Sequence, residues 1–347
     1  MDKLEHQSLE VERTLTPEIL APYLRIDSQQ SIRPASDFTQ QVLDYYILGE
    51  DKTGYKLPWS QLDDKFRLRA GECTLLGGIN SAGKSLTLGQ LALYCMAQKG
   101  RILSVSLEMS PRSQLIRMYR MASCNVKPDL DFGLKFNNWS KDKLFFFDKE
   151  GTMDLNTLEA GIRYSIHHFG TDLILVDSLM TISGIRHDDY TAQTDVACRL
   201  ADIARDLECH IILVAHARKS FSIRDKIDRF SVRGAGQLTD RFDNVILIQR
   251  NYPDNSEDPD VTLTISKARH WDMAECEIDL WMDMASMNLL TANQSTYTII
   301  PDDFKYMADE EEDVDIDPPD EYHRELPTFG EVMKNVYEDQ KGHNCED

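Results

Sequence analysis

The residues that could do chemistry begin with a glycine-rich run in the first third of the chain. The run fits the pattern G-x-x-x-x-G-K-[ST], follows an apolar stretch and opens a helix-like one, which is the setting of a phosphate-binding loop. Its glycines allow backbone N–H groups to close around a polyphosphate, while Lys84 would neutralise phosphate charge and the Ser85 hydroxyl would bind Mg²⁺. The run therefore predicts binding of ATP, or of another nucleoside or deoxynucleoside triphosphate, together with Mg²⁺. The predicted nucleotide contacts are Gly78, Asn80, Ser81, Ala82, Gly83, Lys84, Ser85 and Leu86.

Two acidic residues end apolar runs farther along the chain. Asp177 follows Leu173–Val176 as in a Walker B strand, so it would hold the Mg²⁺ at the carboxyl end of the sheet. Glu108 follows Ile102–Leu107, a run that we expect to form a strand beside that of the phosphate loop. A carboxylate there could polarise the water that attacks the γ-phosphate. The simpler alternative is an acidic residue at a helix N-terminus, favoured by the helix dipole.

A histidine and a basic segment follow the next apolar run. His216 comes directly after Ile211–Ala215, where a polar side chain could contact the γ-phosphate and move when that phosphate leaves. The segment after His216 contains six cationic residues and only two acidic ones. It could therefore bind a polyanion and couple that binding to the state of the nucleotide. A solvated charged loop is the alternative. The six cations are Arg218, Lys219, Arg224, Lys226, Arg229 and Arg233.

A further basic pair follows the predicted strand Val261–Ile265. Arg269 stands near the end of this strand, with Lys267 two residues before it. Such a pair could project into the nucleotide site of a neighbouring subunit, where an arginine finger accelerates phosphoryl transfer about 10³- to 10⁵-fold. The alternative is an ordinary surface pair.

The elements that must position these residues alternate along the chain. Strands are predicted at Thr74–Leu76, Ile102–Leu107, Leu144–Phe147, Leu173–Val176, Ile211–Val214, Val245–Ile248, Val261–Ile265 and Glu277–Trp281. Helices are predicted at Leu86–Gln98, Leu115–Ala122, Leu155–His168 and Thr194–Leu207. This alternation of buried strands and helices predicts an α/β fold with a mainly parallel sheet and helices on both faces. The last strands follow each other closely, which favours an antiparallel edge.

Composition and charge divide the 347 residues into three predicted parts. Residues 1–53 form a polar arm and a short amphipathic helix, Asp37–Leu48, whose apolar face has no local partner. Residues 54–300 form the compact domain. Residues 301–347 carry 17 acidic and 4 basic side chains, which predicts an extended tail that either solubilises the protein or docks a partner. No apolar stretch reaches the ~20 residues of a membrane span and no secretory signal is present, so a cytoplasmic location without membrane contact is expected.

Taken in order, these residues resemble the RecA-type motor domain of the ring-shaped replicative helicases. That family contains DnaB, the mitochondrial helicase Twinkle and the helicase half of phage primase–helicases. The resemblance extends from about Gly54 to Met282 and rests on the motifs INSAGKS, SLEMS, LILVDS, VAHARKS, DNVILIQRN and SKAR. It implies a RecA-like P-loop NTPase core and an ATP-dependent helicase that works as a homohexamer, moves 5′→3′ on single-stranded DNA and unwinds duplex at a replication fork.

The resemblance also implies roles for single residues. Glu108 would orient the attacking water, His216 would sense the γ-phosphate, and Lys267 and Arg269 would act on a neighbouring subunit's nucleotide. Arg250 would pack near the nucleotide base, with Trp281 as the candidate aromatic that closes the base pocket. Single-stranded DNA would contact the loop around Ile185–Tyr190 and the basic segment through Gly234. The family usually has glycines soon after the finger arginine, and this sequence has none there.

The resemblance further implies partners and a source. The helix at Asp37–Leu48 occupies the place of a linker helix that packs on the next subunit. The chain is similar to phage helicases, acting in the host cytoplasm with any primase on a separate protein. The acidic tail would contact replication proteins such as the polymerase or the primase.

Two other classes of protein share part of this pattern. A RecA/RadA-like ATPase that forms filaments on DNA without unwinding would have the same loop, Glu108 and Asp177. It would lack the combination of the RGAG…RN spacing with the K-x-R pair. An ATPase switch or helicase accessory protein would show little stimulation of hydrolysis by DNA.

Overall fold

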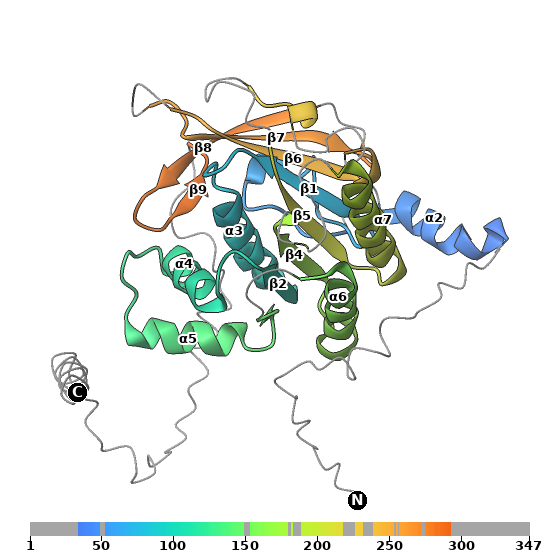
Figure 1. Ribbon diagram of the computed structural model, residues 1–347, viewed down its shortest axis with the longest axis horizontal. Helices are drawn as coiled ribbons and strands as arrows, with labels where there is room; N and C mark the ends of the chain where they lie inside the picture. The colour runs from blue at the N-terminus through green and yellow to red at the C-terminus, as the bar shows by residue number, and fades with distance from the viewer. Residues whose placement is uncertain are drawn as a thin grey trace, which may run out of the picture. The chain divides into compact units, whose positions relative to one another are not determined.

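The computed structural model describes residues 34–48, 53–148, 153–179, 182, 189–217, 226–231, 239–252, 255, 257–271 and 275–292. Within them, nine strands form one sheet in the order β3-β2-β4-β5-β1-β6-β7-β8-β9 (Figure 1). The strands are β1 (Cys73–Gly78), β2 (Ile102–Ser106), β3 (Leu144–Phe146), β4 (Leu173–Asp177), β5 (His210–His216), β6 (Asn244–Arg250), β7 (Val261–Ala268), β8 (Cys276–Asp283) and β9 (Asn288–Leu290).

The sheet is parallel from β3 to β6 and antiparallel from β6 to β9. Every residue of β1, β2 and β4 is buried, as expected for parallel strands covered on both faces. The predicted α/β class, the mainly parallel sheet and the antiparallel edge are therefore confirmed. All eight predicted strands are present, and β9 is an additional short strand that pairs with β8.

The position of β2 corrects one expectation. The strand that leads to Glu108 does not lie beside the strand of the phosphate loop, because β4 and β5 lie between β2 and β1. The expectation was wrong because strand order depends on how the crossovers pack, which a run of apolar residues does not record. Glu108 therefore reaches the phosphate loop from across the ends of two strands.

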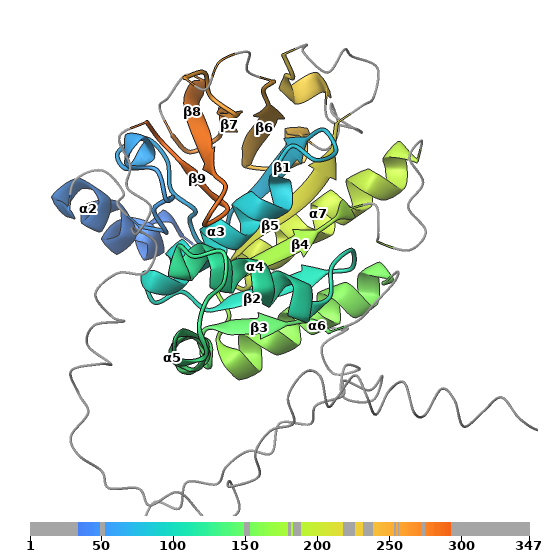
Figure 2. The ribbon, with the colours of Figure 1, turned by 90° about the vertical axis from the view of Figure 1, so that its left-hand side faces the viewer.

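Helices cover both faces of this sheet, as predicted. One face carries α3 (Lys84–Ala97), α4 (Pro111–Ser123) and α5 (Leu130–Ser140), and the other carries α6 (Leu155–Phe169) and α7 (Tyr190–Asp206) (Figure 1). Side chains that alternate along each strand supply the two cores: Leu76 of β1 packs with α3, and Leu75 packs with α6 and α7. Figure 2 shows the twist of the sheet from β8 to β3.

Local capping explains where several helices begin. The side chains of Ser110, Asp129 and Asp154 accept hydrogen bonds from backbone N–H groups in the first turns of α4, α5 and α6. Pro111 stands at the first position of α4, where its missing N–H costs no hydrogen bond. Helix α5 was not predicted, because Gly133 and the aromatic residues around it obscure its helical pattern.

The predicted amphipathic helix before the domain is present as a 3₁₀ turn, η2 (Ala35–Phe38), followed by α2 (Thr39–Leu48). Its described apolar side chains are exposed; Tyr46 and Ile47 are 76% and 74% accessible. Two further 3₁₀ turns, η3 (Ser60–Leu62) and η5 (Arg229–Ser231), lie in the connections. Within the part of the chain that the structure describes, no helix has the length and apolar character needed to cross a membrane. The predicted tail, residues 301–347, lies outside the described residues.

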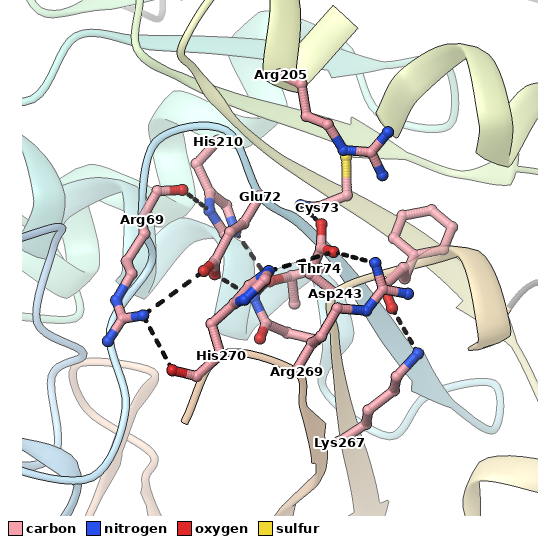
Figure 3. Close-up of polar contacts among 12 residues, drawn as sticks. Arg69, Glu72, Cys73, Thr74, Arg205, His210, Asp243, Lys267, Arg269 and His270 are labelled. Atoms are coloured by element: carbon pink, nitrogen blue, oxygen red, sulfur yellow. Dashed lines mark hydrogen bonds and ion pairs between the residues drawn. The ribbon is translucent and has the colours of Figure 1, made fainter. Parts of the chain in front are cut away.

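A buried polar cluster lies at the amino end of β1 (Figure 3). His210 Nδ1 donates to the main-chain oxygen of Arg69 at 2.6 Å, because that oxygen can only accept. His210 Nε2 therefore accepts from Thr74 Oγ1 at 2.9 Å, and Thr74 Oγ1 in turn accepts from Asn244. Asn244 Nδ2 also donates to Glu72 Oε2 at 2.9 Å. The chain of bonds needs a neutral imidazole.

Stability below neutral pH is expected to depend on His210. Burial lowers the pKa of His210 to about 4, whereas an unfolded histidine titrates near 6.5. Between these values the unfolded chain binds more protons, so the free energy of unfolding falls as the pH falls, by up to about 1.4 kcal/mol per pH unit. His210→Gln should flatten this decline between pH 6.5 and 5 in denaturant titrations. The exposed variant His167→Gln should keep the wild-type slope; equal slopes in wild type and His210→Gln would contradict the assignment.

Candidate nucleotide site

The phosphate loop lies between β1 and α3, and two glycines shape it. A Cβ on Gly78 would meet the main-chain oxygen of Ile248 at 2.6 Å, so only glycine allows β1 and β6 to approach there. Gly83 has a φ of +102°, a conformation that side chains rarely adopt. Helix α3 begins at the next residue, so its first N–H groups, which lack partners within the helix, face the loop. The loop is shaped to receive an anion.

Lys84 occupies the position expected of a phosphate-binding lysine. Its Nζ donates to the main-chain oxygens of Gly78 at 3.0 Å and Ile79 at 2.7 Å, inside the curve of the loop. The residue is only 6% exposed, and this burial lowers the pKa of Lys84 to about 8. Negatively charged phosphate oxygens in the loop would further stabilise the ammonium form.

Ser85 and Asp177 meet at the predicted Mg²⁺ position. Ser85 Oγ donates to Asp177 Oδ2 at 2.8 Å, although 92 residues separate them in sequence. Asp177 ends β4, which lies between the parallel strands β2 and β5, and burial raises the pKa of its carboxyl group. A hydroxyl and a carboxylate supply the hard oxygen ligands that Mg²⁺ prefers, so these two residues fit the ion. A bound cation would favour the ionised carboxylate.

Glu108 lies beside these groups and contacts two further residues. Its Oε1 accepts from Ser178 Oγ at 2.9 Å and lies 3.7 Å from His216 Nε2. The His216 ring, followed by the Ser178 hydroxyl, holds the pKa of Glu108 below its usual value, against the effect of burial. The lowered pKa favours the ionised carboxylate, and its 43% exposure leaves it open to water. Such a group can orient and polarise a nucleophilic water.

His216 joins Glu108 to the phosphate loop. It ends β5, and its Cα pairs with Gly78, the first glycine of the loop. The backbone continues in contact with the loop, because the N–H of Ala217 donates to the main-chain oxygen of Gly78. The buried Nδ1 of His216 has no hydrogen-bond partner among the described residues. The His216 ring thus contacts the Glu108 carboxylate, and the backbone of the same residue pairs with the phosphate loop.

Arg250 lies at the same end of the sheet as the phosphate loop. It ends β6, two residues beyond Ile248, which pairs with Gly78. Its guanidinium lies 5.8 Å from the ring centre of the exposed Tyr252. Trp281, the aromatic suggested by the sequence, is on β8, three strands away from β1, and its Nε1 donates to the main-chain oxygen of Glu257.

Lys267 and Arg269 lie near the amino end of β1, opposite to the end that carries the phosphate loop. Ala268 pairs with Asn244, and Asn244 pairs with Thr74 near the amino end of β1. The strand from Cys73 to Gly78 spans roughly 16 Å at the usual rise per residue, which is longer than an arginine side chain. Neither cation can therefore reach the phosphate loop of the same chain.

Both cations are held by the turn before β6. Lys267 Nζ donates to the main-chain oxygens of Thr239 and Phe242 at 2.7 and 2.8 Å, and burial and the nearby Arg269 lower its pKa. Arg269 makes an ion pair of 2.7 Å with Asp243. Asp243 was not singled out in the sequence, and neither was Ser178. Their roles depend on which strands are neighbours, so the sequence offered no direct signal for them.

Only part of the predicted DNA-binding segment lies in the described residues. Lys226 is exposed and its Nζ lies 2.5 Å from Glu277 Oε1 of β8. Arg229 is exposed in η5. The other cations of the segment, Arg218, Lys219, Arg224 and Arg233, lie outside the described residues, together with Gly234 and the loop 183–188.

The fold and the site together define a P-loop NTPase with a RecA-like sheet. The family model described as the DnaB-like helicase C terminal domain matches residues 54–287, about two thirds of the chain. The chain therefore belongs to the DnaB-like helicase C-terminal domain family, whose members are ATP-hydrolysing helicases of DNA replication.

Two solved structures share this fold. A structure described as an ATPase domain superposes with a TM-score of 0.65 at 19% identity, covering 76% of this chain and 100% of that chain. A DnaB-like replicative helicase, described with its interactions with primase, superposes with a TM-score of 0.63 at 17% identity, covering 74% of this chain and 68% of that chain. At these identities the likeness shows the fold.

Proposed function

We propose that this chain is the motor of a hexameric replicative helicase that moves 5′→3′ along single-stranded DNA and separates duplex at a fork. The helicase activity is inferred from the family. The assembly is inferred from one observation, which is that the proposed catalytic groups lie at the two ends of β1. The phosphate loop, Asp177 and Glu108 lie at the carboxyl end, whereas Lys267 and Arg269 lie at the amino end. A complete site then needs a second subunit.

Each group has a role in hydrolysis under this proposal. Lys84 and the loop bind the phosphates of ATP, and Ser85 and Asp177 hold the Mg²⁺, which neutralises phosphate charge when bound. Glu108 orients the attacking water, and His216 responds to loss of the γ-phosphate because its ring contacts Glu108. The adjacent subunit supplies Lys267 and Arg269. Arg250 lies near the base, with Tyr252 as its described aromatic neighbour.

The basic segment after His216 is proposed to hold the DNA. Because it follows the γ-phosphate sensor directly in sequence, a movement of His216 would be passed into the segment. Lys226 is paired with Glu277 in the isolated subunit, so this ion pair must open before Lys226 binds a phosphate of DNA. Contacts of this kind make affinity fall steeply with salt.

Subunit assembly is proposed to use α2. Its exposed apolar side chains would be buried in a subunit interface. A second group of exposed apolar side chains lies on α4, α5 and the turn between them, and we propose that it receives α2 of the next subunit. The α2 group is Val42, Leu43, Tyr46 and Ile47, and the receiving group is Ile116, Val126, Leu130 and Leu134. Burying such side chains stabilises an interface by about 25 cal/mol per Å².

Deletion of residues 1–50 is expected to abolish hexamers, because it removes α2. A matched deletion of residues 1–33 keeps η2 and α2 and should leave hexamers intact. Sedimentation of both proteins with ATP and Mg²⁺ measures the outcome. Hexamers that survive the longer deletion would refute the role of α2.

The acidic tail, residues 301–347, is proposed to contact a replication partner such as a polymerase or a primase. One structural neighbour is described with its interactions with primase, and the strongly acidic composition favours a basic partner surface. A protein lacking residues 302–347 should therefore unwind a simple fork as well as the full chain. Loss of unwinding on the simple fork would contradict the proposal that the tail serves to contact a partner.

The test of the proposed function is unwinding of forked DNA that carries either a 5′ tail or a 3′ tail, with ATP and Mg²⁺. Unwinding that requires the 5′ tail is the expected result. Unwinding that requires the 3′ tail would refute the direction. Hydrolysis stimulated by DNA without strand separation on either fork, together with helical filaments in electron micrographs, would instead establish a filament-forming ATPase.

A further inference from the structure

Asp243 is a nearly inaccessible carboxylate next to the predicted finger. Its side chain is 4% exposed, and it lies in the turn that connects to β6. Oδ2 accepts from the backbone N–H of Cys73 at 3.0 Å, which ties the carboxylate to β1. Oδ1 accepts from Arg269 Nη1 at 2.7 Å, and His270 Nε2 lies 3.9 Å away (Figure 3). A carboxylate this deeply buried requires such partners.

The bonds to Arg269 fix the direction of the guanidinium. Nη1 donates to Asp243, and Nη2 donates to the main-chain oxygen of Asp240 at 2.8 Å. A guanidinium is planar and has five N–H donors, so two bonds to fixed acceptors set its plane and leave three donors for another ligand. The arginine side chain is 38% exposed, so this remaining edge is accessible.

The acceptors themselves are held in place. Lys267 Nζ binds the main-chain oxygens of Thr239 and Phe242, and the backbone N–H of Asp243 donates to the main-chain oxygen of Cys73 at 3.0 Å. The backbone N–H of Arg269 donates in turn to the main-chain oxygen of Asp243. The turn that carries Asp243 is thus hydrogen-bonded to β1 on one side and to the residues at the end of β7 on the other.

We propose that Asp243 is a positioning residue that orients the Arg269 guanidinium toward the nucleotide of the adjacent subunit. The inference rests on the proposed function, in which Arg269 acts on that nucleotide. A misplacement of about 1 Å in a catalytic group costs roughly 10²-fold in rate, so the orienting carboxylate matters even though it never touches the nucleotide.

The central variant is Asp243→Asn, which keeps the size and removes the charge. An amide can satisfy either Cys73 or Arg269, but not both, because only one of its two ends accepts a hydrogen bond. We expect kcat for ATP hydrolysis to fall roughly 10²-fold, while nucleotide affinity of the subunit's own phosphate loop stays unchanged. The matched control is Asp202→Asn, which removes a carboxylate from the exposed ion pair Asp202–Arg205 and should keep wild-type kcat.

Two further measurements separate positioning from a folding defect. In the Arg269→Ala background, Asp243→Asn should cause no additional loss of kcat, because its effect passes through Arg269. Co-assembled rings of Asp243→Asn and Lys84→Ala should hydrolyse ATP faster than either protein alone, because the intact loop of one subunit meets the intact finger of the other. Additive losses, or no recovery in mixed rings, would overturn the proposal.

A second variant covers the case in which Asp243→Asn does not fold. Arg269→Lys keeps the positive charge beside Asp243 but cannot reach two acceptors with a fixed fork, so kcat should fall at least about 10²-fold. Near-normal kcat in Arg269→Lys would also overturn the proposal. The failures are distinguishable: normal hydrolysis by Arg269→Ala would refute the finger itself, whereas a loss in Arg269→Ala with normal hydrolysis by Asp243→Asn would refute only the positioning role.

Discussion

Arg269→Ala is expected to lower ATP hydrolysis in assembled rings to a small residual rate while leaving nucleotide binding nearly intact. The guanidinium lies at the amino end of β1, beyond reach of its own phosphate loop, so its loss should not weaken binding within the subunit. Its absence removes a positive charge that stabilises the transition state in the next subunit, and such fingers contribute about 10³- to 10⁵-fold in rate.

Rings mixed from wild-type and Arg269→Ala subunits provide the sharper measurement. If each site depends on its neighbour and the sites act together, hydrolysis should fall more steeply than the fraction of wild-type subunits. Nucleotide binding, measured with a fluorescent ATP analogue, serves as the control in the same mixtures. Normal hydrolysis by the pure variant would show that Arg269 is an ordinary surface residue.

Lys84→Ala is expected to remove hydrolysis and also to weaken nucleotide binding, unlike Arg269→Ala. Lys84 Nζ lies within the loop and is bonded to two of its main-chain oxygens, so the charge acts on the phosphates of the same subunit. Loss of a preorganised group that stabilises developing charge costs about 10²- to 10³-fold in kcat, and weaker binding adds to the loss in kcat/KM.

Equilibrium binding and steady-state hydrolysis by Lys84→Ala measure these two effects separately. The exposed lysine Lys99, which follows α3, supplies the matched control, because Lys99→Ala removes one charge near the same helix. A Lys84→Ala protein that binds ATP as tightly as wild type would contradict the proposed contact.

The sequence predicted those parts of the fold that depend on local pattern. Runs of apolar residues identified β1 to β8, although β3 is only partly buried and β8 contains both buried and exposed residues. The run from Gly78 to Ser85 predicted the loop, because glycine conformation and a helix start are local properties. The family match agrees with the resemblance recognised in the motifs. The roles of single residues remain predictions.

The predictions that were wrong or missing concern relations between distant segments of the chain. Strand β2 was placed beside β1, although β4 and β5 separate them, because strand order follows from the crossovers. Strand β9 has three residues, too few to form a pattern. Ser178 and Asp243 went unnoticed because their partners, Glu108 and Arg269, are set by register across the sheet and not by sequence spacing.

The two ends of β1 also determine what kinds of assembly are possible. A contact that joins the carboxyl end of one copy to the amino end of a second copy in the same orientation is heterologous, because different surfaces of the two copies meet. A head-to-tail contact of this kind either closes or grows into an open helix. Closure gives every subunit one complete site, whereas an open helix leaves one loop and one finger unmatched at its termini. Turnover per subunit is therefore independent of size only in a closed assembly, and in an open one it rises with length.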